Sequence, residues 1–90
     1  MVSDEEKRAV WFEAGSITYL EGRGDADLLP PLHDMEAQRW WLGGFGAAWA
    51  KVLKDGESVD DALVRALEGR EELLRQLRSH RAEWGRREGH

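Results

Sequence analysis

The chain has 90 residues, of which 41% are hydrophobic and 34% are charged, and this composition is typical of one folded domain and excludes a disordered acidic tail. It has no cysteine, no apolar run near the roughly 20 residues that span a bilayer, and no basic start followed by an apolar segment, so we expect a cytoplasmic protein without disulfides or a membrane anchor. The net charge of −5 combines −7 over residues 1–69 with +2 over residues 70–90. Such an acidic body disfavours broad binding to nucleic-acid phosphates, and it favours a basic protein surface or a groove that normally holds nucleic acid.

The first helix is predicted to begin at Ser3, because Ser3 and Glu6 have the spacing of a capping box. Apolar residues at helical spacing predict its buried stripe, which comprises Val10, Trp11, Ala14, Ile17 and Leu20. Gly15 in mid-helix costs about 1 kcal/mol relative to alanine, and close approach of a neighbouring helix would offset that cost. Gly22 and Gly24 are expected to end the helix.

Residues 23–34 are predicted to form a linker, because Pro30 and Pro31 cannot continue a helix. We expect the leucines of this linker to lie against the core. Asp34 then has the position and the side chain of an N-cap for a second helix. That helix is predicted to end at Asp55-Gly56.

The second helix combines an aromatic stripe with an unusual set of glycines. Its predicted buried face comprises Trp41, Leu42, Phe45, Ala48, Trp49, Val52 and Leu53. Gly43, Gly44 and Gly46 together cost roughly 2–3 kcal/mol of helix propensity. Two interpretations stay open, namely a groove in which another backbone or a large ring lies close, and a kink or break of the helix.

The third helix is predicted to open at Ser58, with Asp61 three residues further on, and to run through Gly69 to about Trp84. Its spacing of four and three residues is carried by Leu63, Leu67, Arg70, Leu74, Leu77, Arg81 and Trp84. We therefore predict an all-α protein, in which a helical hairpin of two helices is joined by a long third C-terminal helix. Residues 1–84 form one helical domain and residues 85–90 a frayed tail. The half of the stripe left over on the third helix favours a homodimer through it.

No pattern typical of catalysis is present. The histidines lack metal-ligand spacing, and no serine lies in a nucleophile elbow, so we predict no enzyme, no cofactor and no metal site. A histidine with its hydrogen bonds satisfied, or a solvated one, is the expected role for His33, His80 and His90.

The predicted partner-binding residues fall into two groups. Trp40 points about 100° away from Trp41 on a helix. Two interpretations stay open for it: it is exposed and anchors an interface, or it is buried against the linker leucines. Arg39, Gly43 and Gly44 accompany it. The second group lies near the C-terminus and comprises Arg75, Arg78 and Arg81. These arginines could bind nucleic acid or an acidic protein. Alternatively they are solvated and complement the negative end of the helix dipole.

Residues 41–45, Trp-Leu-Gly-Gly-Phe, followed by Ala48, resemble the ribosome modulation factor family, a group of small bacterial proteins. That family has two short helices, spaced glycines in the first and a proline-containing linker between them. In this chain the corresponding residues are Gly15, Gly22, Arg23 and Pro30, and the match covers about residues 10–53. The resemblance implies a helical core and binding to ribosomal RNA. The chain departs from the family in three ways: its matching region is acidic, it lacks a Cys-Pro-Tyr-like linker segment, and it adds a third helix. The resemblance therefore supports the helical core more than it supports ribosome binding.

The sequence therefore predicts a small non-catalytic binding protein, encoded by a phage or an accessory gene, that inhibits or modulates a larger bacterial complex. A protein partner is expected. The alternative is a ribosome-associated hibernation factor that binds ribosomal RNA through the arginine-rich end.

Overall fold

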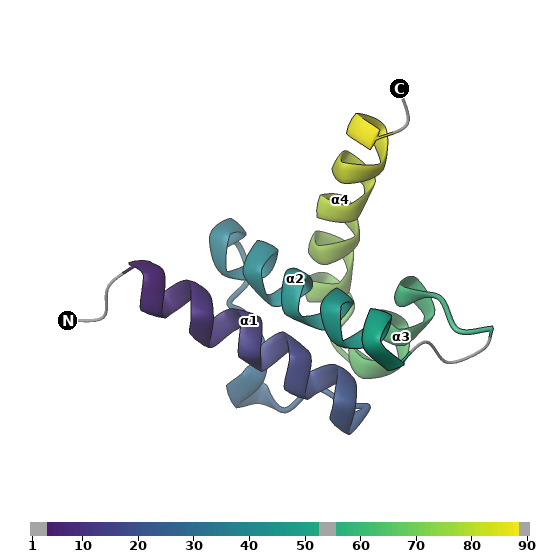
Figure 1. The fold of residues 1–90 in the computed structure, drawn as a ribbon, viewed down its shortest axis with the longest axis horizontal. Helices are drawn as coiled ribbons and strands as arrows, with labels where there is room; N and C mark the ends of the chain where they lie inside the picture. The colour runs from purple at the N-terminus through teal and green to yellow at the C-terminus, as the bar shows by residue number, and fades with distance from the viewer. Residues whose placement is uncertain (1–3, 53–55, 89–90) are drawn as a thin grey trace.

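Helices and their connecting segments make up the part of the chain that the computed structural model describes, which is residues 4–52 and 56–88 for the backbone and residues 5–52 and 56–80 for the side chains. Within these residues there is no β-strand, so the predicted all-α fold is confirmed. Figure 1 shows the elements, which are α1 (Asp4–Glu21), the 3-10 helix η1 (Ala26–Leu28), α2 (Met35–Val52), α3 (Val59–Ala66) and α4 (Glu71–Glu88). The predicted cap at Ser3 and the predicted helix end at Asp55 lie outside the described residues.

Helices α1 and α2 lie side by side and run in the same direction, so the predicted hairpin is wrong (Figure 1). Lys7 near the start of α1 pairs with Asp34 just before α2, with 3.5 Å between Nζ and Oδ2. Near the other end of α1, the Tyr19 ring centroid lies 5.3 Å from that of Phe45. The linker carries the chain from the end of α1 back to the level of its start. Its reach is sufficient, because an extended residue spans roughly 3.3 Å whereas a helical residue rises only about 1.5 Å.

Two glycines bring the backbones of α1 and α2 into contact. A Cβ atom at Gly15 would collide with the carbonyl oxygen of Trp41, and one at Gly44 would collide with the carbonyl oxygen of Phe12. The close approach that was expected at Gly15 is therefore confirmed. For Gly44 the close backbone is also the correct interpretation, because α2 continues without a break from Met35 to Val52.

The buried face of α1 differs from the predicted stripe. Ala14, Thr18 and Tyr19 are buried, whereas Val10 and Leu20 are 57% and 65% exposed. The hydroxyl of Thr18 donates a hydrogen bond of 2.8 Å to the carbonyl oxygen of Ala14, which satisfies it in the interior. The prediction was wrong at the two bulky positions because α1 packs through its small face, where Gly15 meets α2.

The aromatic stripe of α2 forms the centre of the core. Trp41 and Phe45 are fully buried and stack with ring centroids 5.1 Å apart. The indole Nε1 of Trp41 donates to the carbonyl oxygen of Leu28 at 2.8 Å, so the linker is fastened over the ring. The predicted face is confirmed at these positions and at Ala48, but Val52 is exposed. The expectation that the linker leucines lie against the core is likewise met only in part. Leu29 is buried, and Leu32 is exposed.

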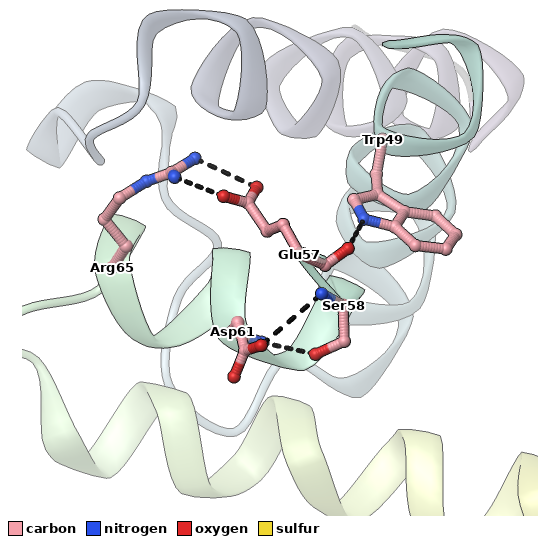
Figure 2. A network of polar contacts seen from close by, with 5 residues as sticks. All are labelled: Trp49, Glu57, Ser58, Asp61 and Arg65. Carbon is pink, nitrogen blue, oxygen red and sulfur yellow. Dashed lines mark hydrogen bonds and ion pairs between the residues drawn. The ribbon is translucent and has the colours of Figure 1, made fainter. Parts of the chain in front are cut away.

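Both predicted N-caps within the described residues are confirmed. Asp34 Oδ1 accepts from the amide of Ala37 at 3.1 Å at the start of α2. At the start of α3, the Ser58 hydroxyl accepts from the amide of Asp61 at 3.0 Å, and Asp61 Oδ2 accepts from the amide of Ser58 at 3.4 Å (Figure 2).

Glu57, which precedes this cap, joins α3 to α2. Its carbonyl oxygen accepts from Trp49 Nε1 at 3.0 Å, and its carboxylate pairs with Arg65 at 2.5 Å. Figure 2 shows the two contacts on either side of Glu57. Trp49 of α2 and Arg65 of α3 thus both bind Glu57. These contacts fix the segment just before α3 against α2.

The predicted long third helix is wrong, because a turn at Leu67–Arg70 divides it into α3 and α4. Gly69 has a φ of +83°, in the left-handed region that favours glycine and ends helices. Helix α4 then points away from the other helices and its backbone stays helical to Glu88, beyond the predicted end at Trp84 (Figure 1). Of the half-stripe predicted to form a dimer surface, Leu77 is buried in the core, and the side chains of Arg81 and Trp84 lie outside the described part.

A polar network fixes the near half of α4 against α2. Gln38 is fully buried and its Nε2 donates to the Pro31 carbonyl oxygen at 3.1 Å and to Gln76 Oε1 at 2.7 Å, while its Oε1 lies 2.9 Å from Nε2 of the buried His80. Gln76 also accepts from the amide of His33 at 3.0 Å. The buried ring of His80 thus has a side-chain amide as its partner, whereas the ring of His33 is exposed, with Nδ1 3.4 Å from Gln76 Nε2.

Candidate functional site

A groove lies between the first halves of α1 and α2. We call it the Trp40 groove, and it has a volume of about 820 Å³. Its lining consists of Arg8, Phe12, Met35, Glu36, Arg39, Trp40 and Gly43. Three of the predicted partner-binding residues, Trp40, Arg39 and Gly43, are therefore brought together in one place.

Trp40 lies in the wall of this groove. Its side chain is 39% exposed. The guanidinium carbon of Arg8 is 5.6 Å from the centroid of its ring, within the range of a cation–π contact. Arg8 Nε is also 3.1 Å from Glu36 Oε1, so the arginine is held from two sides and holds the indole in turn. Of the two open interpretations, exposure of Trp40 is confirmed, and the linker fastens over Trp41 instead.

Phe12 and Met35 supply the remaining apolar surface of the groove and are 40% and 44% exposed. The Phe12 ring lies over Gly43, where an added Cβ would be in ordinary van der Waals contact at 3.6 Å. Gly44, in contrast, is buried under the backbone of Phe12 and does not line the groove. Its predicted role in partner binding is therefore replaced by a role in helix packing.

Arg39 differs from the other arginine of the groove. It is exposed, and in the described part of the chain no ion pair of its guanidinium is found, whereas Arg8 pairs with Glu36. The groove therefore combines apolar walls with one cation that is available to a ligand.

Four residues of the groove were missed by the sequence analysis, namely Arg8, Phe12, Met35 and Glu36. Arg8 and Phe12 lie four residues apart and so share one face of α1. That spacing is a signal in the sequence, but it identifies a groove only once α1 is known to run parallel to α2 and to place this face beside Trp40.

The arginines near the C-terminus form a separate site. Arg75 pairs with Glu72, and Arg78 Nη2 is 3.0 Å from Asp60 Oδ2. Together with Glu71 and Leu74 they line a hollow of about 460 Å³ that shares no residue with the Trp40 groove. The side chain of Arg81 lies outside the described residues. Two of the three predicted cations thus have acidic partners within the protein.

Neither a metal site nor a membrane-spanning helix is found in the part of the chain that is described. No group of three or more histidine, aspartate or glutamate side chains is placed to hold a metal ion there. None of the helices that the structure describes is long and apolar enough to cross a membrane.

Comparison with protein-family models, with curated proteins and with solved structures found no match to this chain. The resemblance to the ribosome modulation factor family accordingly stays a prediction from residues 10–53.

Proposed function

We propose that the protein is a small non-catalytic binding protein that docks onto another protein through the Trp40 groove and thereby inhibits or modulates a larger bacterial complex. The observation that carries this proposal is the exposure of Phe12, Met35 and Trp40 around one groove. Bulky apolar side chains gathered at an open hollow are typical of interface centres, where tryptophan and arginine contribute most of the binding energy.

The ribosome-associated alternative rests on the arginine-rich end and on the family resemblance. The pairing of Arg75 with Glu72 and of Arg78 with Asp60 lowers the positive charge that these side chains offer to phosphates. Co-sedimentation with ribosomes that weakens steeply as salt is raised would favour this alternative. A homodimer through α4 stays a further proposal, which sedimentation equilibrium of the full chain tests directly.

Affinity capture with matched variants tests the docking proposal. The full-length chain is used as bait in a bacterial lysate beside Trp40→Ser and Val64→Ser. Val64 is the control because it is apolar, is 46% exposed against 39% for Trp40, and lies outside the groove. Loss of a hot-spot tryptophan costs about 2 kcal/mol or more, so we expect a bound protein to be depleted at least about tenfold by Trp40→Ser. Val64→Ser should retain it, and circular dichroism should show equal helix content in all three.

Two results would contradict the proposal. One is a set of captured proteins that is the same for the wild type and for Trp40→Ser. The other is a wild-type chain that captures nothing above an empty matrix.

A further inference from the structure

The Trp40 groove carries a positive charge, whereas the whole chain is negative. The chain carries a net charge of −5. Within the groove, Arg8 and Glu36 neutralise each other at 3.1 Å, which leaves the guanidinium of Arg39 as the uncompensated charge of its lining. At physiological ionic strength the screening length is about 8 Å, so a ligand in the groove senses Arg39 more strongly than distant acidic residues.

Glu5 is the acidic residue that limits where a negative ligand can lie. It lines an adjoining hollow together with Arg8, Ala9, Phe12 and Trp40, and Arg39 is not part of that hollow. The two sides of Trp40 therefore differ, since one carries Glu5 and the other carries Arg39. A carboxylate is favoured on the side of Arg39 and disfavoured on the side of Glu5.

We propose that the occupant of the Trp40 groove is a protein segment in which a bulky apolar side chain stands next to a carboxylate. The apolar side chain packs between Phe12, Met35 and Trp40, and the carboxylate pairs with Arg39. This inference rests on the proposed docking function and names the chemistry of its partner. An arginine suits this role because its planar guanidinium binds a carboxylate through two parallel hydrogen bonds.

Three acetylated and amidated dipeptides, Leu-Glu, Leu-Gln and Leu-Lys, serve as probes of this chemistry. Each is titrated into the ¹⁵N-labelled full-length protein while the Gly43 amide and the Trp40 indole N–H are followed by nuclear magnetic resonance. An exposed ion pair contributes up to about 1 kcal/mol, so Leu-Glu should bind about threefold more tightly than Leu-Gln. Leu-Lys should bind most weakly.

Variants assign the preference to Arg39. In Arg39→Gln the Leu-Glu and Leu-Gln dipeptides should bind equally well, whereas Arg23→Gln, at an exposed arginine of the linker, should keep the threefold difference. Both changes are at exposed positions, so the spectra of the variants should otherwise match that of the wild type.

Equal binding of Leu-Glu and Leu-Gln to the wild type would overturn this inference and leave the docking function in place. Resonance shifts confined to residues outside the groove, or no shift with any dipeptide, would overturn it as well. The affinity capture then decides separately whether the proposed function also fails.

Discussion

The pair α1 and α2 and the pair α3 and α4 are held in place by different kinds of contact. Between α1 and α2, Gly15 and Gly44 remove side chains from the interface and let the backbones touch. The other two helices and the turn between them reach the core through buried leucines, which are Leu63, Leu67, Leu73 and Leu77. Leucine side chains identify a buried face directly, whereas on α1 the face at the glycine contact carries the small residues Ala14 and Thr18.

This contrast explains where hydrophobic spacing was a reliable guide. On α3 it correctly identified Leu63 as buried, because a leucine contributes to the core through its own side chain. On α1 it selected Val10 and Leu20, which are exposed, because close backbone contact determines which face meets α2. A glycine at an unfavourable helical position was the better signal there.

The largest effect is expected from a methyl group at the glycine contact. Gly44→Ala places a Cβ atom against the backbone of Phe12, which cannot move without separating the two helices. We expect the free energy of unfolding to fall by about 3 kcal/mol, at the upper end for overpacking. Urea denaturation followed by circular dichroism measures it.

Gly46→Ala is the matched control in the same helix, because an added Cβ there meets no atom within 4 Å. Alanine has the higher helix propensity, so this variant should gain up to about 1 kcal/mol. A similar loss of stability in both variants would mean that the glycines matter through the unfolded chain and not through the contact.

A smaller effect is expected from Gln38, whose amide joins α2, the linker and α4. Gln38→Met keeps the length of the side chain but leaves the Pro31 carbonyl oxygen and His80 without these hydrogen bonds. We expect a loss of about 2 kcal/mol, because the variant loses the hydrogen bonds of a fully buried amide, each of which contributes about 0.5–1.5 kcal/mol. Hydrogen exchange should show faster opening of α4 than of α1.

Ser79→Ala, at an exposed position of α4, is the control and should change neither quantity. Uniform acceleration of exchange in all helices of Gln38→Met would show that the network stabilises the whole fold and does not specifically hold α4.

The smallest effect is expected at the turn between α3 and α4. Gly69→Ala forces a side chain into the left-handed region at a φ of +83°, and should cost about 1 kcal/mol. Gly69→Asn should cost less, because asparagine adopts this conformation more readily. A rise in both stability and helix content in Gly69→Ala would instead indicate that α3 and α4 can join into the single helix that the leucine spacing predicted.

The sequence by itself was sufficient for the all-α class, for the caps at Asp34 and Ser58 and for the burial of Trp41 and Phe45, because these depend on residues within one or two turns of each other. It also named Trp40, Arg39, Gly43 and Gly44 as partner-binding residues, of which the structure places the first three in one groove. The tertiary structure alone decided that α1 runs parallel to α2 and adds Arg8 and Phe12 to that groove, since the path of a twelve-residue linker depends on contacts between distant segments. The tertiary structure also decided that a helix ends before Gly69. The spacing of the leucines fits both one long helix and two helices joined by a short turn. The contact of Gln76 on α4 with Gln38 on α2 requires the turn.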